Sequence, residues 1–553
     1  MDIEQLRTAV LIAGGGPAGL TMAIELGRAG VASILVNDMP DTAQHPKANA
    51  IGARTMEHLR RLGCADAVRR CGLADDHPTD VAYFTAVDGY ELARLHMPSR
   101  ADALRLAREG RGPWPSPEPP HRCSQIFLER ALKARAATFP SVDLRFGWRL
   151  ADWRDTGEGI EATVEEVATG RRLAVAARYL AGCDGGRSVV RAQLGIDYAG
   201  ESGVVRPFLG GSMLGIYFRA PDPPSWLKLG ASWQYWIANP RVRCILIHVD
   251  DGDRFLAHVG IPPDADPADV ARRQLVALIG EAAGARAEII SAVPWTAGYA
   301  LAAQSYGAGN AFIAGDAAHL FTPTGGLGMN TGVDDAVNLG WKLAALCNGW
   351  GGARLAASYE AERRPVGVRN VEFARGFAAS VGGVTVTPEI ERDTEAGRAE
   401  RTAVGAHLAD HAYREFIIPG IQLGLRYDGS PIVAAGSGGP PPHHHPNRYV
   451  QDAYPGGRAP HLWLDEGVAL FDRFGPGFTL LRLEGARDDD AATIADAAAR
   501  RGVPLAVLPV AGAAARDLYG AALALVRPDH HVAWRADRAP ADPLALIDTV
   551  RGA

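Results

Sequence analysis

Cysteine is scarce in this chain of 553 residues: there are six, and no two of them form a CxxC pair. Without paired cysteines we expect no disulfide framework, no dithiol redox centre and no bound metal. Widely separated free thiols are typical of a reducing compartment, so the sequence favours a cytoplasmic protein.

The chain also lacks a basic surplus and a long apolar run. It carries 57 Lys and Arg against 63 Asp and Glu, a net charge of −6, which disfavours a nucleic-acid partner. No window approaches the roughly 18 consecutive apolar residues that a membrane span needs. Near the N-terminus, Asp2 and Glu4 stand where a signal peptide would be basic, so none is expected. The composition, 47% hydrophobic, is sufficient for a sizeable core.

A glycine-rich turn follows the first predicted strand. Residues 8–13 (TAVLIA) lead into Gly14-Gly15-Gly16-Pro17-Ala18-Gly19, a helical pattern follows over 20–28, and residues 32–36 predict a second strand. In such a βαβ unit, Gly14 permits the tight turn, Gly16 lets a pyrophosphate approach, and Gly19 lets helix and strand pack closely. The pattern predicts a dinucleotide site at the helix N-terminus, where free N–H groups favour phosphate.

The end of the second predicted strand departs from this fingerprint, which places an acid there to accept from the ribose hydroxyls. Asn37 occupies the strand end and Asp38 follows it. Either side chain could contact the ribose, or both could simply be solvated. Because the chain contains only one GxGxxG, we expect one tightly bound dinucleotide.

Two further glycine-containing motifs follow apolar strands. The first is Cys183-Asp184-Gly185, after residues 178–181. The second begins at Gly315-Asp316 after residues 311–314 and continues through Pro323 to Gly328-Met329-Asn330. An Asp at a strand end can accept from the hydroxyls of a polyol, and glycines allow a flat or anionic ligand to approach the backbone.

The remaining segments predict a mixed α/β chain. Residues 142–180 predict antiparallel strands and residues 213–249 a second antiparallel sheet. Helical patterns cover 266–286, 334–348 and 352–378, and a small α/β unit is expected over 460–553. Residues 437–446 (SGGPPPHHHP) form a low-complexity loop, in which the three histidines lack further ligands at useful spacing.

In this order and at these separations, the three motifs resemble those of the class A flavoprotein monooxygenases, the aromatic hydroxylases related to para-hydroxybenzoate hydroxylase. The resemblance covers about residues 8–375 and includes HPKANAIGARTMEHLRRLG (45–63), SQIFLERAL (124–132) and SYEAERRPVGVRN (358–370). The longer members, among them phenol 2-monooxygenase, 2,4-dichlorophenol 6-monooxygenase and 3-(3-hydroxyphenyl)propionate hydroxylase, carry a thioredoxin-like C-terminal domain. Residues 458–464 and 474–484 resemble that domain, which lacks CxxC here.

The resemblance implies an α/β fold: a Rossmann-like FAD-binding domain, an inserted substrate domain built on an antiparallel sheet, and the thioredoxin-like domain. It places the FAD-binding domain at 1–82, 107–198 and 294–395 (with a helical linker), the substrate domain at 83–106 and 199–293, and the C-terminal domain at 396–553.

It also implies site residues. Those expected to bind FAD, or to lie where NAD(P)H approaches, are Gly14, Gly16, Pro17, Ala18, Gly19, Asn37, Asp38, Lys47, Gln125, Asp184, Gly185, Asp316, Pro323, Gly328, Met329 and Asn330. Two positions depart from the family pattern: Asn37 replaces the usual Glu, and Leu327 replaces a residue that is often Gln.

The implied activity is hydroxylation of a phenolic or other electron-rich ring, with O₂ and NAD(P)H, through a flavin hydroperoxide. Pro323 and Asn49 are expected at the reacting end, where Asn49 orients the substrate because an amide cannot act as a general base. A dry, apolar pocket is required. The candidate residues for it are Tyr217, Trp233, Tyr235, Trp236, Phe255 and Trp295 on the predicted second sheet, and Phe321, which is better placed just before Pro323.

Three alternatives stay open: a Baeyer–Villiger-type oxygenase, another flavin oxygenase on the same fold, and a non-catalytic FAD-binding protein. The expected partners are a small aromatic substrate, O₂ and NAD(P)H, without nucleic acid or membrane, and a homodimer is possible by analogy with relatives. His319 could act as an acid or base beside the flavin, although a structural role is favoured.

Overall fold

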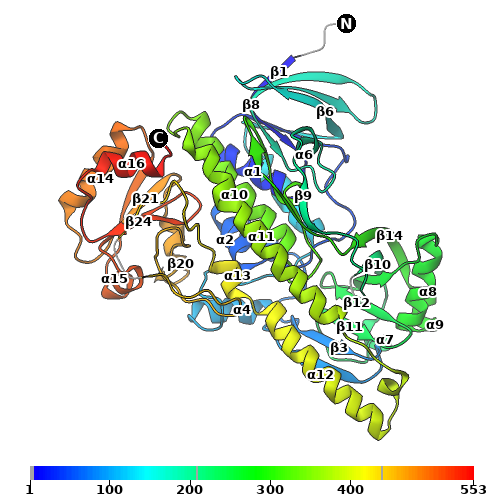
Figure 1. The fold of residues 1–553 in the computed structure, drawn as a ribbon. Coiled ribbons are helices and arrows are strands. Elements are labelled where there is room, and N and C mark those ends of the chain that lie inside the picture. Colours follow the sequence, from blue (N-terminus) through cyan, green and yellow to red (C-terminus); the bar gives the residue numbers. More distant parts are fainter. Residues whose placement is uncertain (1–4, 207–209, 437–439) are drawn as a thin grey trace.

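The computed structural model describes residues 5–206, 210–436 and 440–553 (Figure 1). Asp2 and Glu4, and the start of the low-complexity loop at residues 437–439, lie outside the described residues. None of the helices in the described ranges combines the length and apolar character needed to cross a bilayer.

The largest sheet is parallel in its centre. The strand order is β16-β17-β8-β1-β2-β5, and β17, β8, β1, β2 and β5 pair in parallel. An antiparallel extension pairs β6 with β7 and β7 with β8. The bounds are β1 Gln5–Ala13, β2 Ser33–Asn37, β5 Val142–Phe146, β6 Trp148–Asp155, β7 Ile160–Glu166, β8 Arg172–Gly182, β16 Gly307–Ala308 and β17 Ala311–Ile313. The prediction of antiparallel strands over 142–180 is therefore right for β6 to β8 and wrong for β5, which extends the parallel sheet.

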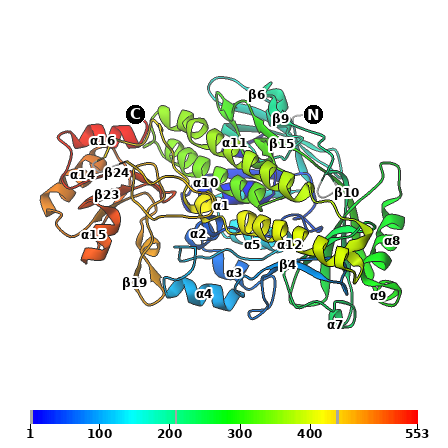
Figure 2. The same ribbon diagram turned by 60° about the horizontal axis from the view of Figure 1, so that its bottom comes forward.

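Helices cover this sheet because their apolar faces complete its core. α1 contacts both α5 and α10, and α10 contacts the long helix α11, which runs beside it in Figures 1 and 2. The bounds of the helices in this part are α1 Pro17–Arg28, α2 Ala53–Leu62, α3 Ala65–Arg69, α4 Arg100–Arg108, α5 Gln125–Ala136, α6 Val189–Gln193, α10 Leu327–Cys347 and α11 Arg354–Gly382. A small sheet of β9 (Tyr198–Glu201), β15 (Ala300–Ala303) and β18 (His319–Leu320), in the order β18-β15-β9, lies beside α11.

A second large sheet has the order β14-β10-β13-β12-β11-β3-β4 and is antiparallel except for the β11–β3 pair. Side chains alternate between its faces, as the period of two requires. One face packs on α8, and the other faces α12. The bounds are β3 Val81–Phe84, β4 Glu91–Leu95, β10 Gly211–Arg219, β11 Gln234–Ala238, β12 Arg243–His248, β13 Arg254–Gly260, β14 Glu288–Ala297, α7 Pro223–Trp226, α8 Pro267–Ile279 and α9 Glu281–Arg286.

Helix α12 (Glu395–Phe416) departs from the predicted boundary. The sequence prediction placed residues from 396 onward in the C-terminal domain, whereas α12 packs on β4 and β3 of the second sheet. Its close approach to β4 depends on Gly405, since a Cβ there would lie 2.2 Å from the carbonyl oxygen of Leu92. Such a contact joins residues some 300 positions apart, so sequence pattern carries no sign of it.

The C-terminal part is a four-stranded mixed sheet, β22-β21-β23-β24, with helices around it. Its elements, with α13 before them, are α13 Pro419–Leu423, β19 Trp463–Asp465, β20 Val468–Ala469, β21 Phe478–Arg482, α14 Asp488–Arg500, β22 Leu505–Pro509, α15 Ala513–Tyr519, β23 Leu523–Val526, β24 Val532–Ala536 and α16 Pro543–Val550. Fully buried ion pairs join it to the rest of the chain, Arg527 with Glu362 and Arg458 with Glu57.

Candidate active site

A cavity of about 1150 Å³ opens where four parallel strands end. The last residues of β1, β8 and β17 are in register, Ala13 opposite Gly182 and Gly182 opposite Ile313. The loops after these strands, and the loop after β2, therefore meet along one edge of the sheet, the usual position of a ligand in an open parallel sheet. The three motifs that lie far apart in the sequence line this one cavity.

The glycine-rich loop forms one wall. Gly14 has φ +103, and a Cβ there would lie 2.1 Å from the carbonyl oxygen of Cys183, so β1 and β8 can approach only with glycine at this position. At Gly16, in contrast, a Cβ would meet no atom within 4 Å, so its backbone is open to the cavity. Helix α1 starts directly after it, and no side chain caps its first turn. Its free N–H groups suit a phosphate.

Asn37 supports this loop. Its Oδ1 accepts from the Gly15 N–H at 2.9 Å, and its Nδ2 donates to the Met39 carbonyl at 3.3 Å. The side chain also lines the cavity together with Asp38. Asn37 therefore holds the glycine loop directly, a contact that the sequence did not indicate.

Two aspartates follow the other strands. Asp184 Oδ2 accepts from the N–H groups of Val189 and Val190 at 2.7 and 3.3 Å, while its buried Oδ1 has no hydrogen-bond partner among the described residues. Asp316 is exposed to the cavity. The surrounding protein raises the pKa of both carboxyl groups through desolvation. Among the described residues, neither the Asp184 Oδ1 nor the Asp316 carboxylate accepts a hydrogen bond, so both could accept from the hydroxyls of a polyol.

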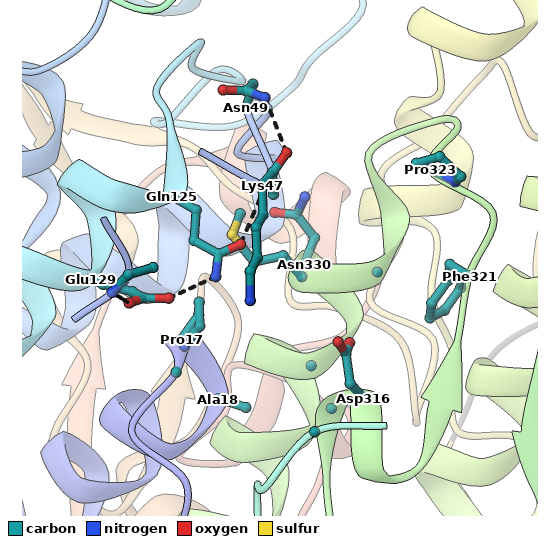
Figure 3. Close-up of a pocket in the computed structure, with 18 of the residues that line it drawn as sticks. Pro17, Ala18, Lys47, Asn49, Gln125, Glu129, Asp316, Phe321, Pro323 and Asn330 are labelled. Carbon is teal, nitrogen blue, oxygen red and sulfur yellow. Dashed lines mark hydrogen bonds between the residues drawn. The ribbon is translucent and has the colours of Figure 1, made fainter. Parts of the chain in front are cut away.

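The middle of the cavity lies between helices α5 and α10. Gln125 Nε2 donates to Glu129 Oε1 at 2.6 Å, and Glu129 Oε2 accepts from the Ala43 N–H at 2.7 Å, which fixes the loop after β2. Asn330 accepts from the Gly52 N–H at 2.8 Å through its Oδ1. Figure 3 shows Lys47 extending into the space between Gln125 and Asn330.

Asn49 lies past Lys47, on the side away from the space between Gln125 and Asn330 (Figure 3). Its Nδ2 donates to the Lys47 carbonyl at 3.1 Å, and its buried Oδ1 has no hydrogen-bond partner among the described residues. Pro323 and Phe321 line the opposite wall, on the segment that leads into α10. This helix also starts without a side-chain cap, at Gly326.

Aromatic side chains form the far end of the cavity. Trp233, Trp236, Trp295 and Phe321 line it, as predicted. Tyr235 does not: it points to the opposite face of the sheet, where it packs with Phe84 in the core against α8, and Phe255 lies in the same core. The alternation of side chains along β11 puts Trp236 and Tyr235 on opposite faces.

Tyr217 is a second correction to the predicted pocket. It lies on the cavity side of the sheet but is not one of the lining residues. The His45 ring packs edge-on against it, with 6.5 Å between the two ring centres. The His45 ring is held there by a hydrogen bond of 2.8 Å between Nδ1 and Ser291 Oγ.

Several lining residues were missed by the sequence reasoning. They are Trp114, Arg122, Ile245, Ile247, His258, Glu415, Phe416 and Gln422. For Arg122 a local signal existed, since it stands three residues before Gln125. Glu415 and Phe416 had none, because they come from the end of α12, whose packing could not be predicted. Glu415 Oε1 accepts from the Gly325 N–H at 2.8 Å and so fixes the loop before α10.

These residues fit FAD. The open backbone at Gly16 and the uncapped start of α1 suit a pyrophosphate, and the orphaned Oδ1 of Asp184 and the carboxylate of Asp316 suit ribose and ribityl hydroxyls. The space between Lys47 and the Pro323–Asn330 segment suits a flat ring.

Comparison with known proteins agrees with this fit. A family model described as "FAD binding domain" matches residues 7–374, and one described as "Aromatic-ring hydroxylase, C-terminal" matches residues 452–551. This chain belongs to the FAD-dependent aromatic-ring hydroxylases. It is an FAD-dependent monooxygenase.

Individual relatives cover nearly the whole of this monooxygenase. "FAD-dependent monooxygenase apdD" of Emericella nidulans is 33% identical, over 97% of this chain and 89% of the relative. The structure "Native and K252c bound RebC-10x" is 36% identical with a TM-score of 0.87, over 99% of both chains. The ternary complex of aklavinone-11 hydroxylase with FAD and aklavinone is 30% identical with a TM-score of 0.80, over 100% of both chains.

Proposed function

We propose that this monooxygenase hydroxylates a phenolic or other electron-rich aromatic ring held at the aromatic end of the cavity. The observation that carries the proposal is the continuity of one cavity from the glycine loop at Gly16 to the indole rings of Trp233 and Trp236. A cofactor held at the first end and a ring held at the second would share this single cavity. Indole and phenyl walls exclude water and pack well on a planar ligand.

The proposal assigns the FAD to the three motifs. Gly14, Gly16 and α1 would hold the pyrophosphate, Asp184 and Asp316 the sugar and ribityl hydroxyls, and the Pro323–Asn330 segment the ring. FAD, when bound, supplies the redox and oxygen chemistry, with NAD(P)H as the reductant. NAD(P)H would approach through a groove near Lys47, because the chain has no second GxGxxG.

The chain's own residues would position and protect the reactants. Lys47 places a positive charge in the cavity between Gln125 and Asn330. Glu415 and Asn330 fix the backbone at Gly325 and Gly52, both of which line the cavity. Asn49 can accept or donate a hydrogen bond but cannot remove a proton at neutral pH, so its role is orientation.

The proposal also includes a finer architecture. The parallel sheet with α1, α5 and α10 corresponds to a Rossmann-like FAD-binding domain, and the antiparallel sheet of β10 to β14 to an inserted substrate domain. The C-terminal sheet, with β21 central between β22 and β23, corresponds to a thioredoxin-like domain. We place the enzyme in the cytoplasm, as a homodimer; light scattering on the purified protein would test the dimer.

The decisive experiment is a product assay. The purified, FAD-loaded protein would be mixed with NADH or NADPH and a panel of phenols in the presence of isotopically labelled O₂. We expect one phenol to stimulate cofactor consumption and to give a hydroxylated product, in equal amount, that carries the label. Consumption that yields only hydrogen peroxide across the panel would contradict hydroxylation. An ester formed from an added cyclic ketone would instead identify a Baeyer–Villiger oxygenase.

A further inference from the structure

Arg122 is a cation inside the aromatic end of the cavity. It precedes α5 and is a lining residue, together with Trp233, Trp236 and Phe416. The Arg122 guanidinium carbon lies 4.2 Å from the centre of the Trp233 ring, over its face. One guanidinium N–H group, at Nη2, reaches the Met97 sulfur at 3.6 Å. A thioether is a weak acceptor, so these contacts leave the Arg122 donors largely unused.

Three buried arginines of this protein have carboxylate partners, whereas Arg122 is half-buried and has none among the described residues. Arg69 lies 2.9 Å from Glu118, Arg363 lies 2.8 Å from Asp335, and Arg527 lies 2.6 Å from Glu362. Within the described residues, no carboxylate oxygen lies within 4 Å of Arg122. Its pKa is lowered to about 10 by desolvation alone, without an opposing negative charge. A charge taken out of water is costly unless an anion or hydrogen-bond acceptor meets it.

The arrangement favours a planar anion. The Trp233 indole covers one face of the Arg122 guanidinium, and the N–H groups of a guanidinium lie at its edge, where an acceptor can still reach them. Two parallel N–H groups of this kind match the two oxygens of a carboxylate. Around them the wall is apolar, formed by Trp236, Ile245, Ile247 and Phe416, so a ring attached to the carboxylate would lie against hydrocarbon and indole.

We propose that the aromatic substrate carries a carboxylate, which Arg122 binds at the end of the cavity remote from the glycine loop. This inference rests on the proposed function, since it takes the aromatic end as the substrate site. It makes Arg122 a specificity-determining residue: the enzyme would select an aromatic acid over the neutral ring of the same shape.

The test compares three planar probes on the FAD-loaded protein: 2-naphthoate, 2-naphthamide and 2-naphthol. Binding would be followed by the change in the visible absorbance of the bound flavin. We expect the wild-type protein to bind 2-naphthoate at least tenfold more tightly than 2-naphthamide. Arg122→Met should remove this preference and leave amide binding within about twofold, because methionine keeps the packing on Trp233 without the charge. Arg122→Lys should restore part of the preference.

Arg130→Gln is the matched control. Arg130 lies in the same segment, on the exposed side of α5, where it donates to Gln44 Oε1 at 3.1 Å, so its loss should not alter the preference. Flavin content and melting temperature would be measured for each variant. Equal binding of acid and amide by the wild type, or equal losses for both in Arg122→Met, would overturn the inference and leave the proposed function intact. Tighter binding of 2-naphthol than of 2-naphthoate would overturn the carboxylate assignment. If no probe perturbed the flavin, the aromatic end would not be the substrate site and the proposed function itself would fail.

Discussion

His319 Nε2 lies 2.6 Å from Oδ2 of Asp335, and both side chains are fully buried. The same Asp335 carboxylate accepts from the Gly315 N–H at 3.2 Å and from Arg363 Nε at 2.8 Å. Burial alone would raise the pKa of Asp335, but His319 and Arg363 hold it below its usual value. His319 does not line the cavity. The His319–Asp335 pair therefore supports the backbone of Gly315 and Asp316 from the side away from the cavity. Its role is structural.

We expect Asp335→Asn to loosen the wall that carries Asp316. The variant would leave the buried His319 without its anion and Arg363 with only the more distant Asp334, at 3.9 Å, and breaking a buried pair in this way costs about 3–5 kcal/mol. Both the melting temperature and the fraction of protein purified with FAD should fall. Asp143→Asn, on an exposed pair with Arg145, is the control and should change neither. Normal flavin content in Asp335→Asn would contradict this account of the wall.

Asp316→Ala separates cofactor binding from folding. Asp316 is exposed to the cavity and forms no ion pair with any of the described residues, so its removal should not lower the melting temperature of the FAD-free protein. The dissociation constant for FAD should rise at least tenfold, measured by quenching of flavin fluorescence. Unchanged FAD affinity would refute the assignment of this carboxylate to the cofactor.

Trp236 and Tyr235 are neighbours in sequence with opposite expected effects. Trp236→Phe should weaken binding of an aromatic ligand several-fold, because the Trp236 ring lines the cavity. Tyr235→Phe should leave ligand binding unchanged and lower stability by about 1–3 kcal/mol, because the hydroxyl is the acceptor for the buried Ser232 N–H, at 2.8 Å. The reverse pattern would show that β11 presents its other face to the cavity.

The buried pair of Glu57 and Arg458 gives a pH dependence. Burial alone would raise the pKa of Glu57, but Arg458 and Arg54 lower it from 4.5 to about 2. Its contribution to stability is therefore complete above pH 4.5 and is lost as the pH falls toward 2. Glu57→Gln should lower the melting temperature near neutral pH and flatten its fall over this acid range, relative to the wild type. Parallel pH profiles of the two proteins would contradict the assignment.

The local motifs could be predicted, and the distant contacts could not. Gly14, Asp184 and Asp316 each follow an apolar strand that can be recognised in the sequence. Because the carboxyl ends of parallel strands meet at one edge of a sheet, their place at that edge could be predicted. The aromatic residues of β11 were predicted as a set, but the sequence does not say which face meets the cavity, and Tyr235 was misplaced for that reason. Arg122 could have been inferred from its place three residues before Gln125. Glu415 could not, because it reaches the cavity only through the way α12 packs on β4.

The most direct test of the account is a crystal structure of the protein with FAD and 2-naphthoate. We expect the pyrophosphate at Gly16 and the start of α1, the flavin ring between Lys47 and the Pro323–Asn330 segment, and the naphthoate ring beside Trp233 and Trp236. A flavin bound outside the edge where β1, β8 and β17 end, or a ring held away from those indoles, would contradict it.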